Sequence, residues 1–300
     1  MIRYLENKEI DRTKWDAAIS GSCHEAPYGY SWFLDVVAGS WDGLVEDDYR
    51  AVMPLPWKSR YGLRYVCQPL NCQQLGVFAP EPQDGKNVRA FLENIPRSFR
   101  MVDVHLNSHN RVPEGLAGVK ERTNYFLCLD RPYEEITRGY HTNTRRNLTK
   151  SSEGACTFGP AEAGDFLRLM ISAHEDEHGP INAVRLKRVI DEFTNAGKAR
   201  TDGASIGGSL CAAVFWVFSE TRIIYMLSAA DERGKEVRAT FSLVDRMIRE
   251  HQDSKMTLDF EGSVIPSVAR FFAGFGAEPE TYNRMRIHRS LLLRILTAGR

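Results

Sequence analysis

Residues 256–277 read MTLDFEGSVIPSVARFFAGFGA, and they contain patterns for a strand, a turn and a helix in direct succession. In the first part, apolar and polar residues alternate, and the polar face carries Asp259 and Glu261. Pro266 suits the first position of the following helix, which is expected to end near residues 274–276. We therefore expect two carboxylates at the end of a strand, beside a helix N-terminus. This arrangement is typical of an active-site rim.

The two halves of the sequence contain similar patterns in the same order. The corresponding pairs are the hairpins 50–70 and 209–228, the helices 88–93 and 237–251, the strands 101–107 and 256–262, and the strands 124–130 and 283–289. Members of a pair lie about 155–160 residues apart, which is longer than the period of a solenoid repeat. The sequence therefore predicts two copies of one α/β module. The alternative is that two unrelated α/β halves share this coarse pattern.

Length and composition describe a globular protein with no strong overall charge. The chain has 300 residues, of which 43% are hydrophobic and 26% charged, and its net charge is zero. At roughly 100–200 residues per domain, two domains are expected, and the boundary is placed between 1–131 and 132–300. The sequence contains neither a signal-peptide pattern nor an apolar run long enough to span a membrane. Six scattered cysteines without CxxC spacing favour a reducing, cytoplasmic location.

Asp259 and Glu261 are the first candidates for catalysis. Residues two apart on a strand point the same way, roughly 6–7 Å from each other. In a dry cleft their repulsion would raise the pKa of one carboxyl, which could then accept a proton from an amine. Glu261 is preferred because it lies nearer the end of the strand. The alternative is structural, with the acids capping a helix or pairing with Arg270 or Arg284.

A second group of polar residues suits phosphate binding. The turn and helix start at 233–238 combine a glycine with three cations, and free amides at a helix start attract anions. The residues concerned are Arg233, Gly234, Lys235 and Arg238. They are predicted to hold the phosphates of a donor, although a solvated turn would have the same sequence.

Three further sites are weaker. Arg145 lies on a basic helix expected over residues 133–150, which would suit a phosphorylated substrate or tRNA, or simply face solvent. Ser263 either caps the following helix or contacts a substrate. Residues 174–178 match H-E-x-x-H, but Gly179 and Pro180 follow at once and no third zinc ligand is apparent, so no metal site is predicted.

The sequence resembles a known superfamily in its C-terminal half. A strand followed by a helix of the form A-x-x-F-[YF], then a glycine and a closing strand, resembles the end of the Gcn5-related N-acetyltransferase (GNAT) fold; here the residues are Ala269, Phe272, Gly276 and Ala277. The doubled module, the helix at 139–151 and the strand LDFEGS resemble the FemAB-like branch, which pairs two such domains. The resemblance covers most of residues 30–290 and implies a mixed α/β fold of two tandem GNAT-like domains.

By this resemblance the donor would bind the second domain, where two neighbouring strands, 222–230 and 257–261, are expected to diverge. Tyr225 and Ser228 would form the wall of that site. Tyr28 and Tyr30, near the start of the first module, are predicted to line an acceptor cleft between the domains. One departure is Phe272, because many GNAT enzymes have a tyrosine there that protonates the leaving thiolate. The usual phosphate-binding loop, Q/R-x-x-G-x-G/A, is also not recognisable.

The sequence therefore predicts an acyltransferase without a metal or a tightly bound cofactor. It would move an acyl or aminoacyl group from acyl-CoA, an acyl carrier protein or aminoacyl-tRNA to the amine of a small molecule or peptide. Glu261, with Asp259, would remove the proton of the amine. The alternative, favoured by Phe272 and by the weak phosphate loop, is a binding module that holds a peptide, lipid or carrier protein in a groove between the domains. Elemental analysis would test the further alternative of a metalloprotein.

Overall fold

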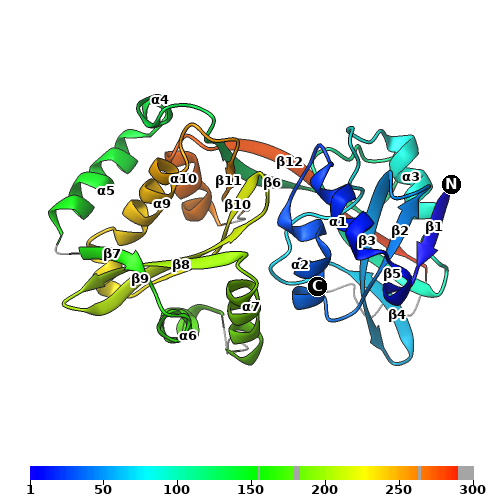
Figure 1. Ribbon diagram of the computed structural model, residues 1–300, viewed down its shortest axis with the longest axis horizontal. Coiled ribbons are helices and arrows are strands. Elements are labelled where there is room, and N and C mark those ends of the chain that lie inside the picture. The colour runs from blue at the N-terminus through cyan, green and yellow to red at the C-terminus, as the bar shows by residue number, and fades with distance from the viewer. Residues whose placement is uncertain (155, 179–182, 263–264, 290–300) are drawn as a thin grey trace. The chain divides into compact units, whose positions relative to one another are not determined.

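The computed structural model describes residues 1–154, 156–178, 183–262 and 265–289, and for 174–178 it describes the backbone alone (Figure 1). The chain forms two compact units. Unit 1 consists of Met1–Thr123 together with Glu280–Arg300, and unit 2 consists of Asn124–Pro279. Both contain helices and strands, which confirms the predicted α/β class.

Unit 1 is built on a sheet with the strand order β1-β2-β3-β4-β5-β12. Neighbouring strands are antiparallel, except that β4 and β5 are parallel. Its elements are β1 (Ile2–Leu5), α1 (Arg12–Ser20), α2 (Ser31–Val37), β2 (Trp41–Glu46), β3 (Ala51–Arg60), β4 (Leu63–Cys67), α3 (Gly85–Glu93), β5 (Phe99–Leu106) and β12 (Glu278–His288), with short 3-10 helices at Asn7–Glu9 and Pro27–Gly29.

Unit 2 has the strand order β6-β11-β10-β9-β8-β7. Here too neighbours are antiparallel, except for the parallel pair β10 and β11. Its elements are β6 (Val119–Cys128), α4 (Tyr133–Arg138), α5 (Thr142–Glu153), β7 (Cys156–Pro160), α6 (Ala163–His178), α7 (Ala183–Asn195), β8 (Ala199–Ile206), β9 (Ser209–Phe218), β10 (Arg222–Ala230), α8 (Glu232–Glu236), α9 (Ala239–Glu250), β11 (Thr257–Asp259) and α10 (Pro266–Gly274).

Both predicted hairpins are confirmed. β3 and β4 are joined by a turn at Tyr61 and Gly62, which both have positive φ, and β9 and β10 are joined through residues 219–221. The basic helix expected over 133–150 is instead two helices, because α4 ends at Arg138 and α5 begins only at Thr142. Between them the amide of His141 donates to the carbonyl of Gly274, so this break packs against the end of α10.

The strand expected at 256–262 is shorter than predicted. β11 ends at Asp259, and Glu261 adopts a left-handed conformation with φ of 57°. The alternation of faces that placed Asp259 and Glu261 side by side therefore stops after Asp259. The predicted side-by-side arrangement of these two acids, which assumed a strand that continues through Glu261, is wrong.

The compact units also differ from a simple division of the chain at residue 131. The strand expected to complete the first module, at 124–130, corresponds to the end of β6, which pairs with β11 of unit 2. The strand expected to complete the second, at 283–289, corresponds to β12, which pairs with β5 of unit 1. Each unit therefore contains, in the same position, the final strand expected for the other module.

In unit 1, the segment between β4 and α3 occupies the space next to the end of β5. The Leu75 amide donates to the His105 carbonyl (2.7 Å), and the Leu75 carbonyl accepts from the Asn107 amide (2.8 Å). On the other side, Val52 of β3 and Phe78 exchange backbone hydrogen bonds of 2.9 and 2.8 Å. Residues 75–78 thus bond to β3 and to β5, and they close the sheet beyond the end of β4.

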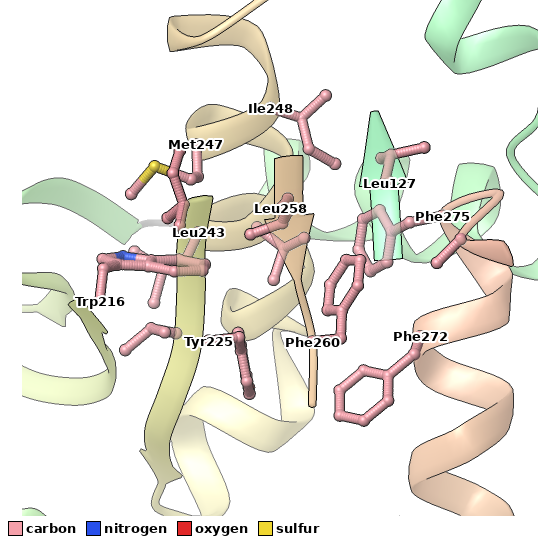
Figure 2. Packing of buried hydrophobic residues seen from close by; sticks show 14 of the residues in the cluster. Leu127, Trp216, Tyr225, Leu243, Met247, Ile248, Leu258, Phe260, Phe272 and Phe275 are labelled. Carbon is pink, nitrogen blue, oxygen red and sulfur yellow. The ribbon is translucent and has the colours of Figure 1, made fainter. Parts of the chain in front are cut away.

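The cores of the two units are separate clusters of apolar side chains. The cluster of unit 1 gathers between β2–β5, α3 and β12 around Phe91 and Phe99. The cluster of unit 2 joins β6, β9–β11, α9 and α10 (Figure 2). Its aromatic rings stack closely: the ring centroids of Phe260 and Phe272 are 5.1 Å apart, and those of Phe260 and Phe275 are 6.0 Å apart. This packing fixes α10 against β11.

A membrane-spanning helix would need a long apolar stretch, and within the described ranges the helices contain none that meets this requirement.

Candidate active site

In unit 2, β10 and β11 diverge after a short stretch of pairing. Their register pairs run from Arg222 with Thr257 to Ile224 with Asp259. β10 then continues to Ala230 alongside β9, with a register shift between Tyr225 and Leu227, whereas β11 has ended. The β10 edge beyond Ile224 therefore faces a space that β11 does not fill.

A cavity of about 310 Å³ lies beside this edge. It is enclosed by β10, by the segment that leads from α8 into α9, and by one face of α10. The lining residues are Tyr225, Ser228, Gly234, Lys235, Arg238, Thr240, Phe241, Ser267, Val268, Phe271 and Phe272. Five of the six residues predicted to bind the donor are among them, although they were proposed from separate segments of the sequence. Their roles in binding stay predictions.

Tyr225 and Ser228 lie at the point of divergence. Tyr225 follows the last register pair directly, and its hydroxyl is hydrogen-bonded with Ser228. Burial raises the pKa of Tyr225 to about 12, while the hydrogen bond with Ser228 opposes this shift. The phenol is therefore protonated at neutral pH, and it is the ionisable group on the apolar wall formed by Phe271 and Phe272.

The predicted phosphate segment splits into two groups. The Arg233 guanidinium binds the Asp231 carboxylate at 2.7 Å, and the Gly234 amide donates to the same carboxylate at 2.9 Å. Neither group is directed to a ligand in this arrangement. Lys235 and Arg238, in contrast, both line the cavity, and Arg238 immediately precedes α9. The cationic end of the cavity is therefore at the start of α9, where the helix dipole also favours an anion.

Gly234 has a structural reason to be glycine. A Cβ at this position would lie 2.3 Å from the carbonyl oxygen of Cys211 on β9. The close approach lets α8 sit directly on β9, and this places Lys235 and Arg238 beside the cavity. Gly234 thus shapes the site through packing.

The two predicted catalytic acids are in different environments. Asp259 is 1% exposed, accepts from the Arg222 guanidinium at 2.7 Å and accepts from the Glu261 amide at 2.8 Å. It stabilises the end of β11, and its partner is Arg222 rather than Arg270 or Arg284. Arg284 instead binds Asp103 in unit 1. Glu261 is partly exposed and lies two residues beyond the end of β11. Catalysis by either acid stays a prediction.

The predicted acceptor residues are not gathered in the cavity. Tyr28 is completely buried and Tyr30 is 6% exposed, both within unit 1, where the Tyr28 ring packs on Phe33. Arg145 donates to the carbonyls of Tyr140, Thr137 and Arg138, and so caps the end of α4. Ser263 lies outside the described residues. A role in acceptor binding stays a prediction for all of these residues.

The H-E-x-x-H motif lies at the end of α6, where the side chains are outside the described residues. Among the side chains that the structure does describe, no group of three or more His, Cys, Asp or Glu residues is arranged to hold a metal ion.

Sequence reasoning missed much of the apolar lining of the cavity. Phe241 and Phe271 fall within helices that the sequence predicts, but no role in a site was predicted for either of them. Their rings meet edge to face at a centroid distance of 4.8 Å. On α10, residues 267, 268, 271 and 272 share one helical face, and this spacing is the signal that would have identified the lining.

Comparison with known proteins agrees with the fold. Residues 137–263, which lie within unit 2, match the family model of an acetyltransferase (GNAT) domain. FemX is similar over 96% of this chain and 98% of its own, with a TM-score of 0.69 and 11% identity. A tandem GNAT protein from the clavulanic acid biosynthesis pathway is similar over 97% and 99%, with a TM-score of 0.54 and 11% identity.

A third solved structure, the C-terminal domain of a putative lysylphosphatidylglycerol synthetase from Agrobacterium fabrum, is similar over 96% of both chains, with a TM-score of 0.55 and 9% identity. A search of the curated proteins finds no match. At these identities the structural likeness establishes the fold alone. The fold is that of two tandem GNAT-like domains, and at this level the predicted resemblance to the FemAB-like branch is confirmed.

Proposed function

Because residues 137–263 match the family model of a GNAT acetyltransferase domain, we propose that the chain is an acyltransferase that binds its donor in the cavity of unit 2. The observation that carries this proposal is the divergence of β10 and β11 beside a cavity of about 310 Å³ within the same unit. An extended donor arm can pair with the backbone of β10 where β11 has ended.

Different residues of the cavity lining suit different parts of a donor. Lys235, Arg238 and the start of α9 would bind a phosphate group, and the aromatic wall of Phe241, Phe271 and Phe272 would surround the acyl group or the apolar part of the arm. Tyr225 and Ser228, which also line the cavity, would place hydroxyl groups beside the reactive carbonyl. The proposal therefore covers both a thioester and an ester donor.

Transfer to an amine needs orientation, carbonyl polarisation and removal of one proton. The edge of β10 would orient the donor and polarise its carbonyl through backbone amides. Glu261 would accept the proton of the amine, since it is partly exposed at the end of β11. The names of two structural neighbours refer to lysylphosphatidylglycerol synthesis and to AcCoA, which supports testing both aminoacyl-tRNA and acyl-CoA as donors.

A thermal-shift screen of the full chain tests donor binding. The ligands are CoA, acetyl-CoA, an acylated carrier protein and several aminoacyl-tRNAs. A donor at 100 times its Kd stabilises the folded protein by about 2.7 kcal/mol, enough to raise Tm by several degrees. The variant Ser267→Trp should abolish the shift by filling the mouth of the cavity. The matched variant Arg270→Trp, on the same helix but outside the lining, should retain it.

Three outcomes of this screen would be decisive. A shift that Ser267→Trp removes, followed by loss of the transfer rate in Glu261→Gln with binding intact, would support the proposed enzyme. A shift given by a donor that is never transferred would favour the alternative of a binding module. If none of the donors raises the Tm of the wild-type chain, the proposal fails.

A further inference from the structure

Phe272 cannot protonate a leaving group, so a transferase with this site needs another proton donor. The described lining of the cavity contains one phenol, that of Tyr225. This residue is on β10, whereas Phe272 is on α10, and their ring centroids are 5.8 Å apart. Figure 2 shows both rings together with that of Phe260, the residue after β11, whose ring centroid lies 6.1 Å from that of Tyr225 and 5.1 Å from that of Phe272.

The position of Tyr225 along β10 is the main argument. The last register pair between β10 and β11 joins Ile224 to Asp259, and Tyr225 is the next residue of β10. The register with β9 shifts between Tyr225 and Leu227. An arm that lies along β10 from Ala230 toward Ile224 must therefore end at Tyr225, because β11 already occupies the edge of β10 at Ile224 and the residues before it. The reactive end of the donor is thus expected beside this phenol.

The ring of Tyr225 is held rigidly. It packs edge to face on Trp216 at a centroid distance of 5.4 Å, and it contacts Phe260 at 6.1 Å and Phe271 at 6.4 Å. Its hydroxyl is hydrogen-bonded with Ser228, which also lines the cavity. A rigid ring with a hydroxyl at the cavity has the preorganisation that a proton donor requires.

On the basis of the proposed function, we infer that Tyr225 is the general acid of the transfer and replaces the tyrosine that is missing at position 272. The amine nitrogen forms a bond to the carbonyl carbon, and the bond from that carbon to the leaving sulfur or oxygen breaks. The leaving atom keeps the electron pair and takes the phenolic proton. The phenolate then regains a proton from solvent through the Ser228 hydroxyl, which balances the proton that the amine gives up.

The acidity of the Tyr225 phenol predicts for which class of donor its proton accelerates the transfer most. Burial raises the pKa of Tyr225 to about 12, far above that of an ordinary thiol at about 8.5. Such a weak acid transfers a proton more readily to an alkoxide than to a thiolate, because the alkoxide is the stronger base. Tyr225 therefore contributes more to transfer from an ester, such as an aminoacyl-tRNA, than from a thioester.

The test compares Tyr225→Phe with the double variant Tyr225→Phe/Phe272→Tyr in the full chain. Phenylalanine keeps the ring packing, so folding should be intact. The probes are acetyl-CoA and alanyl-tRNA with glycinamide as the amine, and donor binding is measured in parallel by thermal shift. We expect Tyr225→Phe to lower kcat by roughly 100-fold or more without weakening donor binding. The double variant should recover at least tenfold, since it returns a phenol to the same cavity from α10.

Comparing donors with different leaving groups distinguishes a proton donor from a residue that only supports the structure. If Tyr225 is the acid, Tyr225→Phe should lose less activity with an aryl thioester, whose thiolate leaves without protonation, than with alanyl-tRNA. If Tyr225→Phe keeps kcat within threefold of the wild type, or loses the same factor with every leaving group, the inference is overturned while the proposed function stands. If the wild type binds these donors but transfers from none, the proposed function fails, and the inference with it.

Discussion

Units 1 and 2 have the same strand order and the same strand directions, but they differ where the single parallel pair of each sheet ends. In unit 1, residues 75–78 bond to β3 and β5 and fill the space beyond β4. In unit 2, β10 continues, β11 stops at Asp259, and a cavity lies beside the exposed strand edge. One topology therefore supports a closed sheet in one unit and a ligand-sized opening in the other. The opening depends on a local segment, because the overall fold is shared.

A buried acid marks the same register position in both units. Asp103 pairs with Cys67 across β5 and β4, as Asp259 pairs with Ile224 across β11 and β10. Asp103 binds two arginines of β12, Arg284 and Arg286, whereas Asp259 binds Arg222 of β10. In unit 2 the ion pair thus joins the two strands that separate immediately afterwards, and it holds them together up to the point of divergence.

The largest effect is expected from breaking this pair in unit 2. Arg222→Met should lower the free energy of unfolding by about 3–5 kcal/mol, because it leaves the Asp259 carboxylate buried without its cation. Urea denaturation measures the loss. The double variant Arg222→Met/Asp259→Leu should recover most of it, since apolar groups replace both charges. In unit 1, Arg286→Met should lower the free energy of unfolding by less, because Arg284 still binds Asp103. A loss below 1 kcal/mol for Arg222→Met would contradict this account.

The closed sheet of unit 1 depends on Gly76, which has φ of 85°. A Cβ at this position would lie 2.4 Å from the Asn110 side-chain oxygen and 3.2 Å from the Leu106 Cα. Gly76→Ala should therefore lower the free energy of unfolding by about 2–4 kcal/mol, because the added Cβ overpacks the site and alanine is strained in a left-handed conformation. Gly62→Ala is the matched control, because Gly62 also has positive φ but no neighbour near its Cβ, and it should cost about 1 kcal/mol. Similar losses for the two variants would show that residues 75–78 are not tightly held.

The buried acid of unit 1, Asp103, predicts how the stability of the protein depends on pH. Burial alone would raise the pKa of Asp103, but the guanidinium groups of Arg284 and Arg286 outweigh it and lower the pKa below the ordinary value. The unfolded chain then binds the proton first as the pH falls. The contribution of Asp103 to stability is therefore complete above the ordinary aspartate pKa of about 3.9 and is lost progressively below it.

Unfolding by urea between pH 6 and pH 3 measures this effect. The free energy of unfolding should fall toward low pH, with a slope from this one group of at most about 1.4 kcal/mol per pH unit. Asp103→Asn should be less stable at pH 6 and should show a flatter profile. An unchanged slope in that variant would mean that other carboxyl groups cause the acid sensitivity.

The smallest effect is expected at the cationic end of the cavity. Arg238→Ala should weaken the binding of a phosphate-bearing donor such as CoA by about 3–10-fold, since an exposed charge contributes on the order of 1 kcal/mol. Binding of pantetheine, which has no phosphate, should not change. Arg270→Ala removes the same charge from α10 outside the lining and should leave both affinities unaltered. Equal weakening for CoA and pantetheine would place the phosphates elsewhere.

Local patterns in the sequence predicted much of this fold. The two hairpins, the main helices and the repeat of the module follow from the spacing of apolar residues and turn residues, which depends on near neighbours. The end of β11 was not predictable in the same way, because nothing in the residue type of Glu261 requires a positive φ. The break between α4 and α5 was missed because the basic pattern continues across Gly139.

The candidate site was predicted only in part. Tyr225, Ser228, Lys235 and Arg238 were proposed from a resemblance and from charge, and they do lie around one cavity. The partner of Asp259 was not predicted, because the choice among several arginines depends on the register of β10 and β11. The segment that closes unit 1 was also missed, since its hydrogen bonds connect residues that are far apart in the sequence.

The exchange of final strands has a consequence for the synthesis of this protein. Arg284, which binds Asp103, comes 181 residues later in the chain. While the ribosome is still making the intervening residues, the outer edge of β5 has no strand to pair with. An edge left open in this way can associate with other nascent chains. The sheet of unit 1 can therefore be completed only after β12 has been synthesised, and protection of the β5 edge by chaperones until then would raise the yield of native protein.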